Sequence, residues 1–180
     1  MNVIIRAEKP TEREVSERIL RAAFGREDEV RLSTALRGLS DFNPNLSLVG
    51  ADENEIRGYA LYHRSTVDTG TGSQPALLLS PIGVDPAYQR QGIGERLVRH
   101  GLERCRVVGL ELVFVIGLPP YFSRFGFQPA APLGLTPSIA IPEDQFQVID
   151  LSGRMLGKIQ GRVALPSPIA GGGQPVPTDS

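Results

Sequence analysis

Residues 85–97 read Asp-Pro-Ala-Tyr-Gln-Arg-Gln-Gly-Ile-Gly-Glu-Arg-Leu, and this segment carries most of the information about the chain. It follows an apolar run that ends at Val84 and precedes a segment, 92–108, whose apolar residues recur every three to five positions. The first pattern predicts a buried strand and the second an amphipathic helix, with the glycines in the turn between them. The first amides of a helix have no partner within it and point along the positive end of its dipole. The segment therefore predicts an anion site in which a phosphate approaches the backbone at Gly92 and Gly94.

Two familiar phosphate motifs do not fit this turn. A dinucleotide-binding G-x-G-x-x-G needs a third glycine where Leu97 stands, and it normally follows the first strand of its domain. A P-loop ends in Gly-Lys-Ser/Thr, but the lysines of the chain are Lys9 and Lys158. A tight strand-to-helix connection without a ligand is the remaining alternative, and the elements around the turn decide against it.

Upstream of the turn, the patterns predict a strand at 3–5, two helices and a hairpin. Thr11 and Glu14 fit a capping box for the first helix, with Val15, Ile19, Ala22 and Ala23 on one face. A second amphipathic helix is expected over 30–39, and residues 46–49 and 56–67 alternate as an antiparallel pair. Strand 76–85, helix 92–108 and strand 112–116 then form a right-handed β-α-β unit. The fold class is α/β, with α+β character in a mixed sheet.

Downstream of that unit, residues 119–124 suit a short helix begun by proline. Residues 125–127 read Phe-Gly-Phe and are expected to begin a strand, and 145–149 is expected to be the last strand. Residues 1–165 are interpreted as one domain. Residues 166–180 are rich in glycine and proline and are expected to form a flexible tail.

The motif Gln89-x-x-Gly92-x-Gly94, placed after a central strand, resembles the GNAT superfamily of N-acetyltransferases. The two early helices, the hairpin and the later Phe-Gly-Phe strengthen the resemblance, which covers roughly residues 3–130 and points to a bacterial branch of uncharacterised members. It implies a mostly antiparallel central sheet that is splayed within the β-α-β unit. It also implies transfer of an acetyl group from acetyl-coenzyme A to a primary amine, by direct attack in a ternary complex.

The same resemblance assigns the coenzyme site. Backbone amides of the turn would hold the pyrophosphate, and the pantetheine arm would run beside the preceding strand, where Pro81 and Gly83 fit a bulge. The amide of Ile82 would stabilise the oxyanion. The coenzyme-binding residues are thus Ile82, Gly83, Val84, Gln89, Arg90, Gln91, Gly92, Ile93, Gly94 and Glu95.

The catalytic side chains depart from the family pattern. Phe122 stands where many members have the tyrosine that protonates the leaving thiolate, so Tyr121 is the candidate catalytic residue although neighbouring helical residues point about 100° apart. No general base stands out: His63 is expected to be a half-exposed surface histidine, and one of Tyr59 and Tyr62 a core residue. The alternative function is therefore an acyl-coenzyme A-binding regulatory module with weak or lost catalysis.

Composition excludes several other classes. The 180 residues contain 19 Lys+Arg and 20 Asp+Glu, a formal charge of -1, so broad electrostatic binding of nucleic acid or acidic membrane is not expected. The lone Cys105 rules out an internal disulfide, argues against a cysteine-rich zinc site and indicates a reducing, cytoplasmic location. No metal is expected. The partners are acetyl-coenzyme A and a small-molecule or peptide amine of unknown identity, and the resemblance allows a homodimer.

Overall fold

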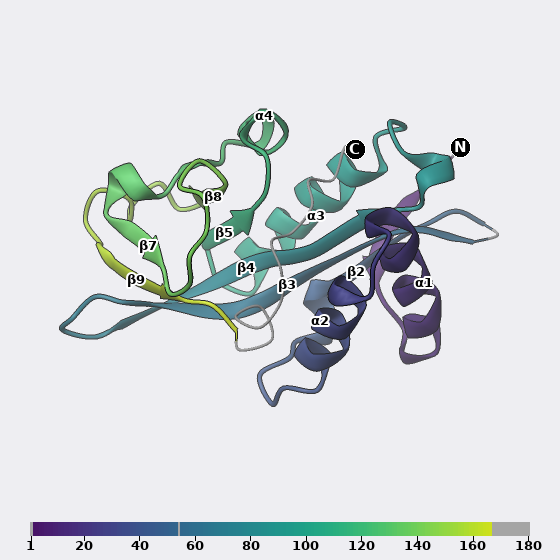
Figure 1. The fold of residues 1–180 in the computed structure, drawn as a ribbon, viewed down its shortest axis with the longest axis horizontal. Coiled ribbons are helices and arrows are strands. Elements are labelled where there is room, and N and C mark those ends of the chain that lie inside the picture. The colour runs from purple at the N-terminus through teal and green to yellow at the C-terminus, as the bar shows by residue number, and fades with distance from the viewer. Residues whose placement is uncertain (1, 54, 167–180) are drawn as a thin grey trace.

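The computed structural model describes residues 2–53 and 55–166, which form a nine-stranded sheet with helices packed on both faces (Figure 1). The predicted tail lies, from residue 167 onward, outside the described residues. The strands are β1 (Ile4–Ala7), β2 (Ser47–Ala51), β3 (Ile56–Asp68), β4 (Ser73–Val84), β5 (Leu112–Ile116), β6 (Gln128–Pro129), β7 (Leu135–Pro137), β8 (Phe146–Asp150) and β9 (Gly161–Ala164). The helices are α1 (Arg13–Phe24), α2 (Asp28–Arg37), α3 (Ile93–Val107) and α4 (Pro119–Phe122). Short 3-10 turns are η1 (Pro10–Glu12), η2 (Pro44–Leu46), η3 (Pro86–Tyr88), η4 (Ser123–Phe125) and η5 (Ala131–Leu133).

The order of strands in the sheet is β1-β2-β3-β4-β5-β8-β6, with β9 beside β3 and β7 beside β9. Pairing is antiparallel except between β4 and β5 and between β7 and β9. β4, α3 and β5 form the predicted β-α-β unit. The mixed, mostly antiparallel sheet is therefore confirmed.

The long strands β3 and β4 form the centre of the sheet, and both faces of β3 are covered. Tyr59 belongs to the apolar cluster under α1 and α2, whereas Tyr62 belongs to the cluster under α3. The expectation that one of these tyrosines is in the core understated their burial, since both side chains are almost fully buried. The Tyr62 hydroxyl donates a hydrogen bond to the Val98 carbonyl oxygen at 2.9 Å, which ties α3 to β3.

β4 contains a bulge and then separates from β5. Leu79 pairs with Tyr62 and Ile82 pairs with Ala60, so two residues of β4, 80–81, stand opposite one residue of β3. Gly83 was expected to contribute to this irregularity, but it is in regular register with Tyr59. β5 pairs with β4 over 77–79, whereas β3 follows β4 as far as Val84. The segment 80–84 therefore has one edge turned away from β5, as the resemblance implied.

Several predicted boundaries are wrong for local reasons. Pro10 begins a 3-10 turn, and the Glu12 carboxylate accepts the Lys9 N–H at 2.8 Å, so the Thr11–Glu14 capping box does not form. α1 buries Ile19 and Leu20 and leaves Ala22 exposed. Residues 125–127 complete η4 and lead into β6, which begins one residue later. β8 is not the last strand, because the four-residue β9 pairs with β3.

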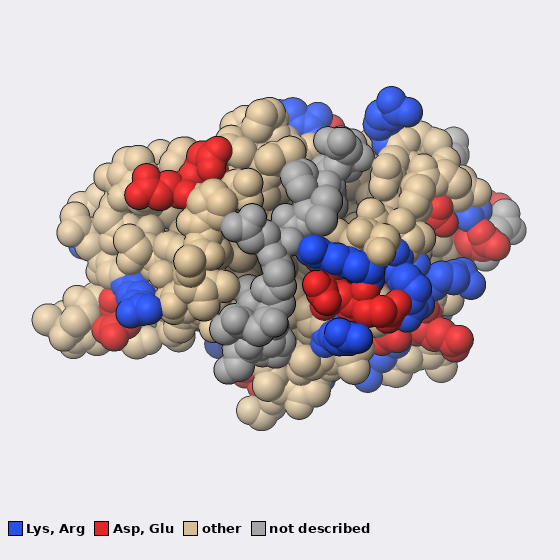
Figure 2. Space-filling model, viewed as in Figure 1, with Lys and Arg blue, Asp and Glu red and all other residues tan. Residues whose placement is uncertain are grey.

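The face of the molecule that carries α1 and α2 mixes both signs of charge. Figure 2 shows blue and red side chains gathered together over these helices. The pairs there include Arg21 with Glu27, and Arg26 with Glu29. On this face the charges largely neutralise one another locally, in keeping with the balanced composition.

Candidate active site

The predicted turn leaves the first amides of α3 open. Gly92 is the N-cap residue, has a φ of +80°, and has no side chain that could accept a hydrogen bond from the first amides of the helix. The first main-chain bond of the helix runs from the Arg96 N–H to the Gly92 carbonyl at 3.0 Å, so the amides of Ile93, Gly94 and Glu95 precede it. A Cβ at Gly92 would meet nothing within 4 Å. The turn therefore presents donors to open space, which is the geometry that suits a phosphate.

Local hydrogen bonds fix the chain that enters this turn. The Asp85 carboxylate accepts the Ala87 N–H at 2.9 Å, and the Asp85 N–H donates to the Arg57 carbonyl at 2.8 Å. The Gln89 side-chain amide donates to the Val84 carbonyl at 3.1 Å. Because that contact occupies the side chain within the turn, Gln89 offers a ligand its backbone.

Arg57 is a supporting residue that the sequence analysis missed. Its guanidinium lies 4.0 Å from the centre of the Tyr88 ring, and it is bonded to Asp52 at 3.1 Å and to Glu55. Tyr88 thus packs beside the turn. Arg57 is distant from the turn in sequence and lies in an alternating strand, so only the antiparallel register of β3 and β4 reveals this contact.

A cavity of about 330 Å³ lies in front of the turn. Val84 from β4 and Tyr121 from α4 contribute to its wall. The full lining is Val84, Tyr88, Arg90, Gly92, Ile93, Gly94, Glu95, Tyr121 and Arg124. Ile82 and Gly83 are buried one to two residues back along β4, and Gln91 is exposed on the turn. The structure thus brings most of the predicted coenzyme residues together around one cavity.

Tyr121 and Phe122 point to different surroundings. Tyr121 lines the cavity, and its ring packs edge-on against Phe122 and Phe125 at centroid distances of 4.9 and 5.4 Å. Phe122 is 2% exposed, and a Cβ placed on Gly117 would come within 2.3 Å of its ring. The aromatic residue in the family's tyrosine position is therefore a core residue, whereas the neighbouring Tyr121 lines the cavity, although its hydroxyl oxygen is itself buried.

Gln147 is a second residue that the sequence analysis missed. It is fully buried on β8, and its side-chain amide donates to the Gly117 carbonyl at 3.1 Å, just beyond the end of β5. Within residues 2–53 and 55–166, nothing donates to its Oε1. A buried polar side chain in a strand was the available signal, but its proximity to the splayed end of β5 follows only from the pairing of β8 with β5.

The remaining titratable candidates are inward-facing. His63 is 4% exposed rather than half-exposed, because it lies on the covered face of β3. Burial lowers its pKa, and Asp41 has a smaller, opposing effect. Burial raises the pKa of Cys105, on the apolar stripe of α3, to about 12, so its thiol is unreactive at neutral pH.

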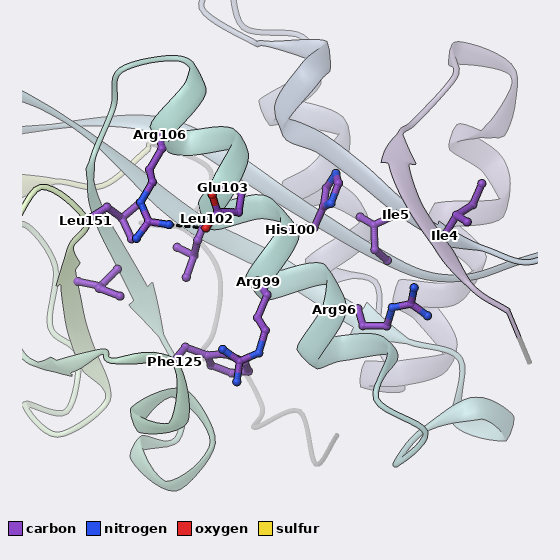
Figure 3. A pocket seen from close by; sticks show the side chains of 11 residues that line it. Ile4, Ile5, Arg96, Arg99, His100, Leu102, Glu103, Arg106, Phe125 and Leu151 are labelled. Atoms are coloured by element: carbon purple, nitrogen blue, oxygen red, sulfur yellow. Dashed lines mark hydrogen bonds and ion pairs between the residues drawn. The ribbon is translucent and has the colours of Figure 1, made fainter.

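A larger hollow of about 700 Å³ follows the outer side of α3 (Figure 3). Arginines border it, but the Arg106 guanidinium is paired with Glu103, as the dashed line in the figure shows, and Arg99 is paired with Glu95 at 2.8 Å. Arg106 and Glu103 form an exposed i,i+3 pair, which is typical of the solvated face of a helix. The α3 residues that line this hollow begin at Arg96, whose N–H already makes a main-chain bond within the helix, so the hollow does not face the open amides that mark the smaller cavity.

A phosphate-suited turn after a central bulged strand, with the next parallel strand splayed away, defines the architecture of an acyl-coenzyme A-dependent acetyltransferase. Residues 13–127 match the acetyltransferase (GNAT) family, and the chain belongs to that family.

Related proteins agree with this assignment. The uncharacterised N-acetyltransferase YjhQ of Escherichia coli is 37% identical over 123 residues, which cover 68% of each chain. The uncharacterised N-acetyltransferase YhbS of the same species is 32% identical over 162 residues, covering 89% of this chain and 95% of YhbS.

Two solved structures share the fold. The crystal structure of YhbS in complex with coenzyme A has a TM-score of 0.88 at 28% identity, covering 97% of this chain and 95% of that one. A GNAT family acetyltransferase from Brucella melitensis in complex with acetyl-coenzyme A has a TM-score of 0.76 at 26% identity, covering 93% and 98%.

The described residues contain neither a membrane-spanning helix nor a metal-binding cluster. None of the helices in residues 2–53 and 55–166 has the length and apolar character of a membrane span. In the same ranges, no three His, Cys, Asp or Glu side chains are grouped so as to hold a metal ion.

Proposed function

We propose that this protein transfers an acetyl group from acetyl-coenzyme A to a primary amine, by direct attack of the amine in a ternary complex. The observation that carries the proposal is the open turn at Gly92–Glu95, which faces a cavity beside the splayed edge of β4. The coenzyme A and acetyl-coenzyme A complexes of the two structural relatives support the choice of coenzyme.

The residues present fit that coenzyme. The amides from Gln89 to Glu95 would hold the pyrophosphate, with Arg90 and Gln91 on the same turn. The edge of β4 that carries Ile82, Gly83 and Val84 has no strand paired on the β5 side in the described chain, so its main-chain groups would pair with the pantetheine amides. Acetyl-coenzyme A supplies the thioester, and the protein supplies its placement.

The chemistry sets unequal demands on the protein. A primary amine with a pKa of about 10.4 is only about 0.1% neutral near pH 7.4, whereas a thiol with a pKa of about 8.5 leaves readily as the thiolate. The neutral amine forms the new C–N bond, the C–S bond breaks, and the proton that the amine loses passes to solvent water. We assign the Ile82 N–H to the oxyanion and Tyr121, the hydroxyl-bearing residue at the cavity, to protonation of the thiolate.

A binding experiment with two matched glycine variants tests the coenzyme site. Gly92 and Gly25 both have a positive φ, and at both a Cβ would meet nothing within 4 Å, but Gly25 caps the far end of α1. Ala at either position costs similar backbone strain, about 1–2 kcal/mol. Isothermal titration should show affinity for acetyl-coenzyme A at least about tenfold weaker in Gly92→Ala and unchanged in Gly25→Ala. Equal affinity in the two variants would refute the site.

Thiol release with a panel of amines tests the reaction. We expect Tyr121→Phe to lower kcat about tenfold to a hundredfold, less than a typical lost general acid because the thiolate already leaves well. Phe122→Tyr is the control, since that ring lies in the core and should not change the pH dependence of turnover. A protein that binds the coenzyme but releases no thiol with any amine would instead be the regulatory module.

We extend the proposal to the limits and location of the unit. Residues 1–165 form one acetyltransferase domain, an assignment supported by the continuous sheet that joins β1 to β9. The single buried thiol suits a reducing cytoplasm. Detection of an intact, independently folding fragment shorter than 1–165 after limited proteolysis would contradict the domain assignment.

A further inference from the structure

Proton removal from the attacking amine needs an acceptor, and the side chains at the cavity are poorly suited to this role. Glu95 is hydrogen-bonded to Arg99 at 2.8 Å, and this bond lowers the pKa of its carboxyl group. Arg90 and Arg124 are cations, and Tyr121 is the proton donor of the proposed reaction. A proton acceptor for the amine therefore has to come from elsewhere around the gap between β4 and β5.

His63 lies on β3 beside the point where β4 and β5 separate. It is in register with Leu78 of β4, and the next residue of β4, Leu79, is the last one that pairs with β5. Residues directly opposite each other in an antiparallel pair have Cβ atoms about 4.5–5.5 Å apart. The imidazole is therefore a direct neighbour of the end of the β4–β5 pairing, just before the bulge at 80–81.

His63 faces the side of the sheet opposite the coenzyme cavity. Side chains alternate along a strand, and Tyr62 packs in the cluster under α3 that also contains Val84 of the cavity wall. On the other face of β3, Leu61 belongs to the cluster under α1 and α2, and Val67 belongs to the cluster that includes β7 and β9. These two groups of elements lie apart along β3 (Figure 1), and His63 lies at the seam between them. The seam offers the amine a side of the gap that the coenzyme does not occupy.

The His63 ring is neutral and uncommitted. No hydrogen bond joins either ring nitrogen to a residue in 2–53 or 55–166. Burial lowers the pKa of His63 below the ordinary 6.5, and Asp41, in the loop after α2, opposes this with a smaller effect. The buried charges of Arg37 and Glu8, on the same face of the sheet, are paired with each other. The ring therefore carries an unprotonated nitrogen at neutral pH, as a proton acceptor must.

We propose that His63 accepts the proton of the attacking amine through one bridging water. The proposal rests on the proposed function, because it names the proton acceptor of the same reaction. As the C–N bond forms, the amine proton passes to the water, and a proton of that water passes to the unprotonated ring nitrogen. The imidazolium then releases its proton to solvent, which restores the neutral ring. Ile82, whose amide serves the oxyanion, pairs with Ala60, three residues or about 10 Å along β3 from His63, so a water relay suits the distance better than direct contact.

The pH dependence of thiol release tests this role. The probe is whichever of an alkylamine, an amino sugar and an unblocked peptide reacts fastest with the unmodified protein. His63→Gln should lower kcat about a hundredfold at pH 8. The loss should shrink as the pH falls below the pKa of His63, because a protonated ring accepts no proton, and the affinity for acetyl-coenzyme A should not change. His100→Gln alters the other histidine of the chain and should keep kcat at every pH.

Asp41→Asn moves the same titration without altering the ring. Because Asp41 raises the pKa of His63, its neutralisation should shift the acid limb of the kcat profile to lower pH. Asp144→Asn, also at an exposed position, is the control and should leave the limb in place. Asp41 is itself exposed, so this variant tests the proposal even if His63→Gln does not fold.

Three outcomes would overturn the proposal. An unchanged kcat at pH 8 in His63→Gln would show that the ring takes no proton. A loss of the same size at every pH would give His63 a structural role only. An acid limb that stays in place in Asp41→Asn would mean that the limb belongs to another group. Failure of the unmodified protein to release thiol with any amine is a different pattern, and it would refute the proposed function itself.

Discussion

The turn before α3 and the buried cluster at the end of α2 are both rich in polar groups. The polar groups of the cluster bond to one another, whereas those of the turn face open space. In the cluster, the Arg37 guanidinium makes two hydrogen bonds to Glu8, at 2.6 and 3.1 Å, and a third to Glu17 at 3.2 Å. The Glu8 carboxylate also accepts from Ser47, whose hydroxyl meets the hydroxyl of Tyr59. At the turn, the first amides of α3 have no capping side chain, and Arg90 and Arg124 beside them make no ion pair in the described chain.

This difference in pairing distinguishes polar groups that stabilise the fold from polar groups that are available to bind a ligand. A buried charge is tolerated only when its partners are complete, so the Arg37 cluster is closed to solvent, with the Arg37 and Glu8 side chains 3% and 2% exposed. A binding site instead needs polar groups whose hydrogen-bonding partners are incomplete until the ligand binds. Whether a polar group already has its partners thus says more about its role here than its residue type does.

The largest expected effect concerns the closed cluster. Arg37→Met leaves the Glu8 carboxylate buried without its cation, which should lower the free energy of unfolding by about 3–5 kcal/mol. Arg21→Met is the matched control, because Arg21 pairs with Glu27 on the surface and its loss should not be measurable. Urea denaturation of the two variants checks the contrast. Similar urea midpoints for the two variants would show that the buried ion pairs of Arg37 contribute no more to stability than the surface pair of Arg21.

Asp150 is a second carboxylate whose hydrogen bonds are made within the protein. It accepts N–H groups from Ser152, Met155 and Leu156, at 3.0, 2.6 and 3.1 Å. Burial raises the pKa of Asp150, but the hydrogen bond from the Ser152 hydroxyl, at 2.6 Å, and these backbone hydrogen bonds together lower it below the ordinary 3.8. Asp150→Asn should therefore cost about 1–2 kcal/mol of stability at neutral pH.

The pH dependence of that variant has a definite sign. Because the folded-state pKa is lowered, the carboxylate's contribution is complete above the ordinary value of 3.8 and is lost as the pH falls through the folded value. Denaturation curves of Asp150→Asn and the unmodified protein should converge in that acid range. Asp144→Asn, at an exposed position, should show no difference at any pH. A constant gap down to pH 2 would contradict the assignment.

Arg57 connects the two kinds of region, since it is itself paired yet supports the open turn through Tyr88. Replacing Tyr88 by Leu removes the ring under the guanidinium and should weaken coenzyme A binding about threefold to tenfold. Tyr88→Phe keeps the ring and should keep the affinity. Titration calorimetry measures both, and equal losses in the two variants would show that the Tyr88 hydroxyl, not the stacked pair, matters.

The smallest expected effect concerns stability at the open site. The double variant Arg90→Gln, Arg124→Gln removes two unpaired charges, so its thermal midpoint should equal that of the unmodified protein in the absence of coenzyme. Its coenzyme A affinity should fall and depend less on salt, because fewer charges face the phosphates. A clear drop in midpoint would place these arginines among the groups that specify the fold.

Much of this architecture could be predicted from residues 76–116. The apolar run of β4, the helical period of α3 and the glycines between them identify the β-α-β unit and the turn, because these signals are local. Arg57 and Gln147 could not be found in this way, since their roles depend on which strands become neighbours. The orientations of Tyr121 and Phe122 also escaped prediction, because a one-turn helix followed by a 3-10 turn does not fix which ring enters the core.

The pairing of β9 with β3 has a consequence for synthesis of the protein. Val67 of β3 is in register with Val163 of β9. The end of this central strand therefore pairs with a segment that lies almost a hundred residues later in the chain. Until that partner emerges from the ribosome, one edge of β3 beyond β2 is an unpaired strand that invites contacts with other chains. The nascent protein is therefore most vulnerable to aggregation after the turn before α3 has been synthesised and before β9 has been.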